Sequence, residues 1–155
     1  MKKYWLFKSE PEEYGIIDLA KAKKGRWDGI RNYQARNFIK TMKEGDFVYF
    51  YHSSCPTPGI YGLMEIVGAY YPDPTAFDPS SPYYAQGHRS PKEPWLSIDV
   101  QFKEQFNVPL TLHEIKKLPL GQCPLINQGN RLSIIPLTID QFDLIAHTLS
   151  LLNKV

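Results

Sequence analysis

Cysteine is scarce in this sequence, and its four histidines do not cluster. The only cysteines, Cys55 and Cys123, fit neither a zinc-binding pattern nor a disulfide framework, so we expect two free thiols. The histidines lie far apart along the chain and lack the spacing of metal ligands. A glycine-rich loop of the kind that cradles phosphates is not present either. We therefore expect no metal and no cofactor.

Long hydrophobic runs are also missing. No stretch approaches the roughly 18 consecutive apolar residues that a membrane-spanning helix needs, and no signal-peptide core follows Met1. These absences predict a protein without a membrane partner. We expect it in the cytoplasm, or in the nucleus if its source is a eukaryote.

The residues that are present indicate a globular protein with a localised positive charge. The 155 residues suit a single domain over residues 1–155, with 43% hydrophobic and 22% charged residues. The net charge is only +2, but the segment from Lys21 to Lys43 holds eight basic residues and one acidic residue, Asp28. Such a segment is typical of a surface that faces phosphates, or of two helices with solvated lysines. We favour the phosphate-facing surface.

Short strands with helices inserted between them predict an α+β fold, and a small curved β-barrel flanked by short helices fits their order. The continuous apolar run Phe47–Tyr51 indicates a strand covered on both faces. Ser9 and Glu12 have capping-box spacing for a helix start, and six prolines between Tyr70 and Pro94 predict a long ordered loop. We expect strands over Tyr4–Lys8, Asp46–His52, Gly59–Val67 and Leu96–Phe102, and helices over Ile17–Lys23, Tyr33–Met42, Thr111–Lys117 and Thr138–Leu149.

A possible catalytic group stands at the end of the strongest predicted strand. There His52 precedes Ser53, Ser54 and Cys55, so a base, two hydroxyls and a thiol occur together. Adjacent residues of a strand point to opposite faces, however, so His52 does not naturally face Ser53. We expect no catalytic residue here. A hydrolase or nucleotide-modifying enzyme using His52 with Ser53 or Cys55 stays open as an alternative, as does a protein-interaction module that uses the proline-rich loop.

Trp27 stands in a polar, glycine-flanked segment, Gly25–Asn32, rather than on a periodic apolar face. A tryptophan in such a loop can offer its flat ring to a nucleobase. Asn32, Asp28 and Ser9 have side chains that can read base edges by hydrogen bonds. The alternative is that Trp27 only covers the end of the barrel and Asn32 only caps a helix. The candidates for holding the nucleic-acid backbone through its phosphates are Arg26, Arg31 and Arg36.

Several motifs in order along the chain resemble those of the EVE domain family. The opening run Tyr4–Pro11 (YWLFKSEP), the run Trp27–Asn37 (WDGIRNYQARN) and the run Gly45–Ser53 (GDFVYFYHS) carry the resemblance. Shorter matches follow at Tyr71–Thr75 and at Arg131–Ser133. Together they span about Lys3 to Leu149.

The resemblance implies a PUA-like fold, related to RNA-binding PUA domains and to the YTH domain. It also implies a reader of a modified base, methylated or otherwise, in DNA or RNA, which binds the base in an aromatic pocket at the barrel mouth. We further expect a monomer. By similarity to YTH readers, Lys8, Ser9 and Trp27 fall at the pocket wall, and Tyr84 is a candidate second aromatic wall. The ligand-binding candidates are Lys8, Ser9, Trp27, Asn32, Tyr51, His52, Ser53, Tyr84, Arg131 and Ser133.

Overall fold

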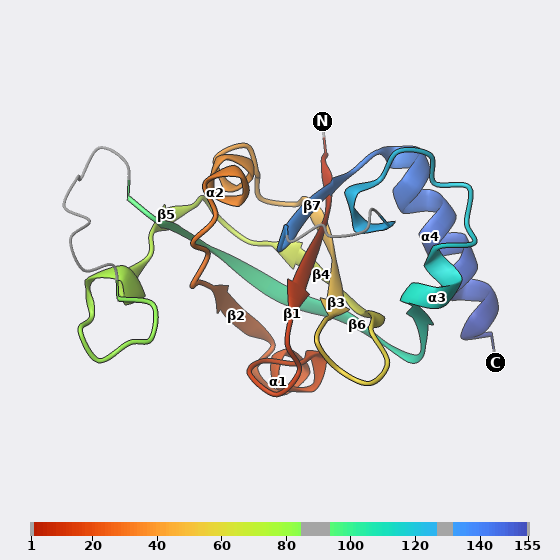
Figure 1. Cartoon of the computed structure of the whole chain (residues 1–155), viewed down its shortest axis with the longest axis horizontal. Coiled ribbons are helices and arrows are strands. Elements are labelled where there is room, and N and C mark those ends of the chain that lie inside the picture. Colours follow the sequence, from red (N-terminus) through yellow and green to blue (C-terminus); the bar gives the residue numbers. More distant parts are fainter. Residues whose placement is uncertain (1, 85–93, 127–131, 155) are drawn as a thin grey trace.

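A mixed sheet of seven strands runs through the protein, and helices cover both of its faces (Figure 1). The structure is a computed structural model that describes residues 2–84, 94–126 and 132–154. The strands are β1 (Tyr4–Ser9), β2 (Lys24–Trp27), β3 (Phe47–His52), β4 (Gly59–Ile66), β5 (Tyr71–Pro72), β6 (Leu96–Thr111) and β7 (Ile134–Leu137). The helices are α1 (Ile16–Ala22), α2 (Tyr33–Ile39), α3 (Leu112–Ile115) and α4 (Ile139–Leu152), with 3-10 turns at Pro74–Phe77 and Pro124–Ile126.

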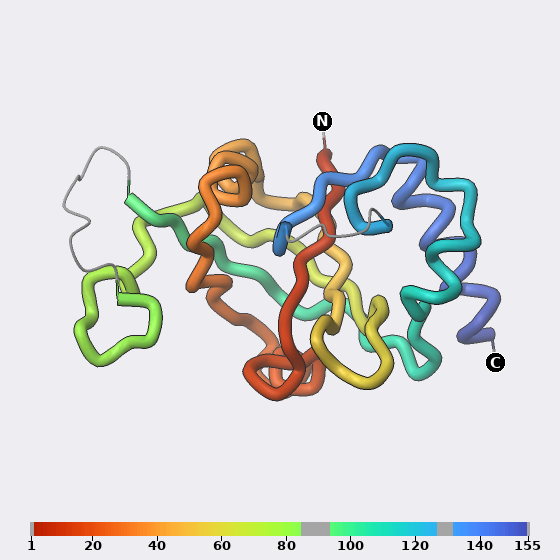
Figure 2. The backbone as a smooth tube through the Cα atoms, in the orientation of Figure 1, coloured from red at the N-terminus to blue at the C-terminus, as the bar shows by residue number. Residues whose placement is uncertain are grey.

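The parallel pair β1 and β3 lies in the middle of the sheet. Tyr4 lies opposite Phe47, and Ser9 lies opposite His52. On the outer sides of this pair, β7 runs antiparallel to β1, and β4 runs antiparallel to β3. The long strand β6 then pairs with β4, β2 and β5. In the tube trace, β6 carries the chain from the side of α2 to the side of α3 and α4 (Figure 2).

Side chains of the central strands alternate between two hydrophobic cores, as expected for a sheet covered on both faces. Phe7 and Phe50 enter a first core together with residues of α1, α2 and β2. Tyr49 and Tyr51 enter a second core together with residues of α3 and α4. The prediction that β3 is covered on both faces is therefore confirmed, and this burial explains its continuous apolar run.

The sheet is not closed into a barrel, so the expected barrel is wrong, while the α+β class is confirmed. The hydrogen-bonded order is β2-β6-β4-β3-β1-β7, with β2 and β7 at its two ends. Helix α2 contacts both β6 and β7. Its apolar residues Ala35 and Ile39 fill the first core, so a helix occupies the opening that pairing of the end strands would otherwise close.

Two local predictions about helix starts had different outcomes. The predicted capping box at Ser9 is wrong, because Ser9 belongs to β1 and its Oγ donates a 2.7 Å hydrogen bond to the carbonyl of Tyr14. Helix α1 begins at Ile16 instead. The start of α4 is confirmed, since Thr138 caps it and accepts a hydrogen bond from the N–H of Gln141. None of the helices in the described part of the chain has the length and apolar character needed to cross a bilayer.

Candidate nucleic-acid interface

A cavity of about 800 Å³ opens where β1, β2 and β3 end. Because β1 and β3 are parallel, Ser9 at the end of β1 lies beside the residues that follow β3, and the N–H of Ser53 donates to the carbonyl of Ser9 at 2.9 Å. Ser133, just before the antiparallel strand β7, accepts a 2.8 Å hydrogen bond from the N–H of Lys8. A volume of this order is typical of sites that enclose a small ligand.

The cavity brings together many of the residues expected to bind a ligand. Its lining includes Lys8, Ser9, Trp27, Ser53 and Ser133, and also Arg26 and Arg31. Arg131 lies outside the described residues. The remaining candidates are not in the cavity lining, namely Asn32, Tyr51, His52, Tyr84 and Arg36.

Trp27 is the last residue of β2 and packs into the first core, so the prediction that it stands in a loop is wrong. Only 7% of its surface is exposed. The ring centroid lies 5.2 Å from those of Phe7 and Phe50, and Tyr14 meets it edge-on at 6.3 Å. Trp27 therefore borders the cavity with a small part of its surface, while most of its ring is fixed by neighbouring aromatics.

Tyr83 lines the cavity together with Trp27 and Tyr14, where the sequence had suggested its neighbour Tyr84. Its ring lies on the backbone of Gly29, where a Cβ atom would come within 2.7–2.9 Å of three ring carbons. Gly29 also has a φ of +75°, which glycine adopts without strain. Residue 29 must therefore lack a side chain for Tyr83 to occupy this wall.

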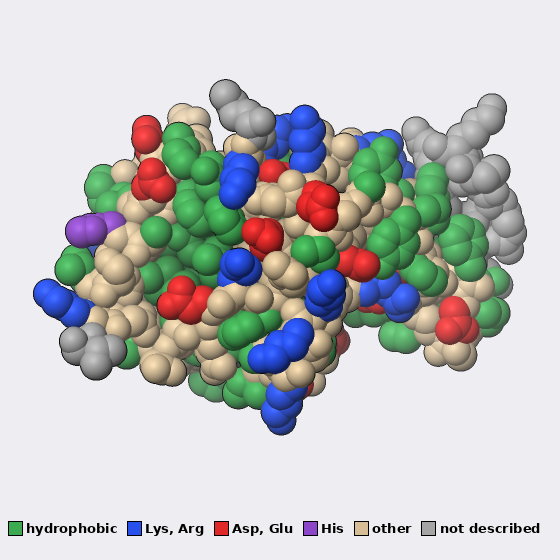
Figure 3. Space-filling model, turned by 180° about the vertical axis from the view of Figure 1, so that it is seen from behind, with side chains coloured by type: hydrophobic (Ala, Val, Ile, Leu, Met, Phe, Trp, Pro, Cys, Tyr) green, Lys and Arg blue, Asp and Glu red, His purple; other side chains and the backbone are tan. Residues whose placement is uncertain are grey.

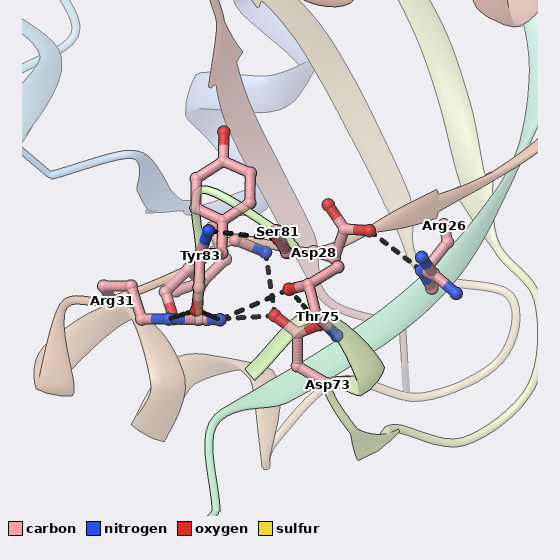
Figure 4. Close-up of polar contacts among 9 residues, drawn as sticks. Arg26, Asp28, Arg31, Asp73, Thr75, Ser81 and Tyr83 are labelled. Atoms are coloured by element: carbon pink, nitrogen blue, oxygen red, sulfur yellow. Dashed lines mark hydrogen bonds and ion pairs between the residues drawn. The ribbon is translucent and has the colours of Figure 1, made fainter. Parts of the chain in front are cut away.

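Arg31 and Asp73 anchor this wall (Figure 4). Arg31 donates from Nη1 to Oδ2 of Asp73 at 2.9 Å, and from Nη2 to the carbonyl of Tyr83 at 2.6 Å. Asp73 is fully buried and also accepts from the N–H groups of Gly29 and Thr75. Burial raises the pKa of Asp73, but the hydrogen bonds from Thr75, Gly29 and Arg31 outweigh burial and lower it overall.

The three arginines expected to hold phosphates have different surroundings. Arg26 is exposed and forms a 2.8 Å ion pair with Asp28. Arg36 is only 5% exposed, and its guanidinium lies 5.0 Å from the ring centroid of Tyr33 and 5.4 Å from that of Trp95. The guanidinium of Arg31 is bound to Asp73 and to the carbonyl of Tyr83. Of the three, Arg26 is the exposed residue, and its guanidinium is paired with Asp28 at the surface.

Asn32 and Tyr51 have structural surroundings. Asn32 is exposed and caps α2, accepting a 2.9 Å hydrogen bond from the N–H of Ala35. This is the alternative that the sequence left open. Tyr51 is buried in the second core, and burial raises its pKa to about 12. Lys8 lies near that ring, with Nζ 5.9 Å from the centroid, and burial lowers the pKa of its ammonium group.

His52 does not have the arrangement of a general base. Its Nε2 accepts a 3.2 Å hydrogen bond from the N–H of Ile16, and its ring stacks on Tyr61 at 4.1 Å. Burial lowers its pKa, which is consistent with a neutral ring that accepts this bond. The hydroxyl of Ser53 and the thiol of Cys55 form no hydrogen bond with His52 in the described structure. That part of the chain also has no group of three or more His, Cys, Asp and Glu side chains placed to hold a metal ion.

Comparison with known proteins gives the family. Residues 3–148 match the EVE domain. The chain belongs to the EVE domain family. It is 42% identical to mouse thymocyte nuclear protein 1, over 94% of this chain and 73% of that protein.

Solved structures of EVE domain relatives share this fold. A crystal structure of a Pseudomonas syringae protein is 50% identical and has a TM-score of 0.90, covering 94% of this chain and 99% of that one. The structure of human THYN1 in complex with 5-methylcytosine containing DNA is 41% identical and has a TM-score of 0.82, covering 99% of both chains.

In this EVE domain, the motifs that carried the resemblance coincide with the walls of the cavity or with their supports. The opening motif is β1, whose end supplies Lys8 and Ser9, and the third motif is β3, which leads to Ser53. The motif at Tyr71–Thr75 supplies Asp73, which sequence reasoning did not single out. A carboxylate between two prolines was the one feature of the sequence that could have drawn attention to Asp73. Its contact with Gly29 joins residues 44 positions apart, so only the fold reveals it.

Proposed function

We propose that this protein binds DNA that carries a methylated base and receives that base in the cavity beside Trp27 and Tyr83. Two observations support the proposal. A relative with 41% identity over nearly the whole chain forms a complex with 5-methylcytosine containing DNA. The observation that carries it in this chain is the cavity of about 800 Å³, in which the aromatic residues Tyr14, Trp27 and Tyr83 meet the polar ends of three strands. A base must leave the duplex stack to enter such a site, which costs a few kcal/mol.

The lining offers both kinds of hydrogen-bonding group that a cytosine-type base needs. Lys8 supplies only donors, and the carboxylate of Asp28 supplies only acceptors. Cytosine displays acceptors at O2 and N3 and a donor at N4, so the two residues match opposite parts of its pairing edge. Ser53 and Ser133 add hydroxyls that can donate or accept, and the hydroxyl of Ser9, which donates to Tyr14, can still accept. Tyr83 supplies the ring for stacking, and Trp27 supplies an apolar edge.

Positive charge close to the cavity supports a nucleic-acid partner. Arg26 and the lysines at positions 21, 23 and 24 are exposed at the end of α1 and the start of β2. Seen from the face opposite to that of Figure 1, blue side chains gather at the lower middle of the molecule, where α1 and β2 lie (Figure 3). Phosphate contacts of this kind give affinity that weakens as salt rises, and they carry no base identity.

In this proposal the protein acts as a binding module and not as an enzyme. The only arrangement that suggested catalysis was His52 beside Ser53 and Cys55. Since Nε2 of His52 is occupied by the N–H of Ile16, we assign no catalytic role to it. RNA stays within the prediction as an alternative nucleic acid, and the experiment below includes it.

The test is a comparison of affinities for matched oligonucleotides. Wild-type protein is titrated with duplex DNA, single-stranded DNA and RNA of one sequence, each with 5-methylcytosine or cytosine at one position. We expect tighter binding to methylated DNA than to its plain counterpart. Tyr83→Ala should weaken binding to methylated DNA by about 10–100-fold, the loss expected for one stacked base. Tyr84→Ala, at the neighbouring tyrosine outside the cavity, is the matched control. Equal affinity of wild-type protein for methylated and plain strands would refute the proposal.

A further inference from the structure

Arg31 ties together segments of the chain that are distant in sequence (Figure 4). Its Nε and Nη2 donate to the carbonyl of Tyr83 at 3.2 and 2.6 Å, and Nη2 also reaches Oγ of Thr75 at 3.3 Å. Its Nη1 donates to Oδ2 of Asp73 and to the carbonyl of Ile30, each at 2.9 Å. A guanidinium has five N–H donors, and these contacts use all five. Arg31 is therefore committed to the protein and has no donor left for a phosphate.

Asp73 is the buried partner of Arg31 and joins it to Gly29 and Thr75. Its side chain has no exposed surface, and Oδ2 accepts from both Arg31 and the N–H of Gly29. Its other oxygen, Oδ1, accepts from the N–H and the hydroxyl of Thr75 at 2.8 and 2.7 Å. Arg31 is only partly buried, but removing it would be costly because the buried carboxylate of Asp73 would lose its compensating charge. The pair is therefore a fixed point rather than a mobile surface contact.

Tyr83 is held by this tie through both its backbone and its ring. The carbonyl receives two donors of Arg31, and the ring lies 5.7 Å from the same guanidinium. The other support of the ring is the backbone of Gly29, whose N–H is bound to Asp73. The position of Tyr83 in the cavity wall thus depends on Arg31, which it contacts directly, and on Asp73, which holds Gly29.

We propose that Arg31 and Asp73 are positioning residues for ligand selectivity, which act by holding Tyr83 as a fixed wall of the cavity. The inference rests on the proposed function, since it concerns selectivity for a modified base. It replaces the phosphate-binding role that the sequence suggested for Arg31. An aromatic wall set in advance avoids the entropic cost of ordering the ring when the base enters.

Two substitutions test the tie with little change of shape. Arg31→Lys keeps the positive charge but cannot make the forked contact, and Asp73→Asn keeps the size but removes the charge. The matched control is Asp78→Asn. Asp78 makes the same turn, accepting from the N–H and hydroxyl of Ser80 at 3.0 and 2.7 Å, but it is exposed and has no contact with Arg31 in the described structure.

The first measurement is the ratio of the dissociation constants for plain and methylated DNA. We expect the ratio to fall toward one by about tenfold in Arg31→Lys and Asp73→Asn, which is within the range for loss of one stacked ring. Asp78→Asn should keep the wild-type ratio. Binding of plain DNA should change little, because the exposed basic residues remain.

The second measurement follows Tyr83 directly by NMR. The α-proton of Gly29 that points where a Cβ atom would lie is directed at the Tyr83 ring, so the ring current should shift its resonance in the wild-type protein. Tyr83→Leu should abolish this shift, and Arg31→Lys should reduce it in the absence of DNA. A role of Arg31 in general stability alone would not move this resonance in a folded variant. If Asp73→Asn does not fold, Arg31→Lys carries the test.

The possible outcomes separate this inference from the proposed function. Wild-type protein without preference for methylated DNA would overturn both. Wild-type preference that persists in folded Arg31→Lys, with the Gly29 resonance unchanged, would overturn the inference alone. Loss of preference in both variants together with a changed Gly29 resonance is the result that supports it.

Discussion

The indole Nε1 of Trp5 donates a 3.2 Å hydrogen bond to Oδ2 of Asp46, which joins β1 to the turn before β3. Both residues are almost fully buried. Asp46 also accepts 3.0 Å hydrogen bonds from the backbone N–H groups of Lys3 and Lys43. One carboxylate thus satisfies three donors, two from the start of β1 and one from Lys43, and fixes the start of the parallel strand pair that leads to the cavity.

Asp46→Ala should destabilise the protein by about 2–4 kcal/mol, because it leaves the buried indole N–H of Trp5 and the N–H of Lys43 without this acceptor. Urea unfolding should show a lower midpoint with an unchanged slope. Asp143→Ala, on the exposed side of α4, is the control for loss of a carboxylate. A shift no larger than that of the control would show that Asp46 does not fix the strand pair.

His52 should make stability depend on pH. Burial lowers its pKa in the folded protein below the ordinary value of 6.5, so the unfolded chain binds the proton more readily. Its contribution to stability is fully present above about pH 6.5 and is lost as the pH falls through the lowered folded value. Protonation also removes the acceptor for the N–H of Ile16.

Chemical unfolding between pH 5 and 8 measures this effect. His52→Gln offers an amide oxygen to Ile16 and does not titrate, so the difference in unfolding free energy between wild type and variant should shrink as the pH falls. His147→Gln, at an exposed position of α4, controls for removal of an imidazole. Parallel pH profiles for wild type and His52→Gln would contradict the assignment.

The sequence predicted the elements that local pattern determines. The apolar run of β3 and the start of α4 at Thr138 fall where expected. It did not predict β2, whose residues Lys24–Trp27 have no apolar alternation. That strand forms because β6 extends over 16 residues and offers an edge to it, which is a property of the assembled sheet.

The candidate site was predictable in its location and less so in its chemistry. Family motifs indicated Lys8, Ser9 and Ser53, which do line the cavity. Pattern alone cannot tell which of two adjacent tyrosines faces inward, because that depends on the contact of Tyr83 with Gly29.

Gly29→Ala should separate backbone strain from displacement of Tyr83. The φ of +75° strains any side chain by about 1–2 kcal/mol, and the new methyl group would meet the Tyr83 ring. Gly121→Ala is the matched control, since Gly121 has a φ of +69° but no atom within 4 Å of an added Cβ. Thermal melting should show destabilisation of both variants. Only Gly29→Ala should lose preference for methylated DNA, and an equal preference in the two variants would argue against a role for the Tyr83 wall.

Arg26 and Arg36 should respond in opposite ways to substitution, although both belong to the same basic segment. Arg26→Ala removes an exposed cation near the cavity, so it should weaken binding to methylated and plain DNA equally and reduce the salt slope by about one. Arg36→Ala removes a buried guanidinium packed near Tyr33 and Trp95, so it should cost about 1–3 kcal/mol of stability and leave the salt slope unchanged. Titrations at two salt concentrations and urea unfolding measure the two effects. Lys40→Ala, at an exposed position just after α2, is the control for loss of one positive charge from this segment. A reduced salt slope in folded Arg36→Ala would restore the phosphate contact that the sequence suggested and that burial of Arg36 argues against.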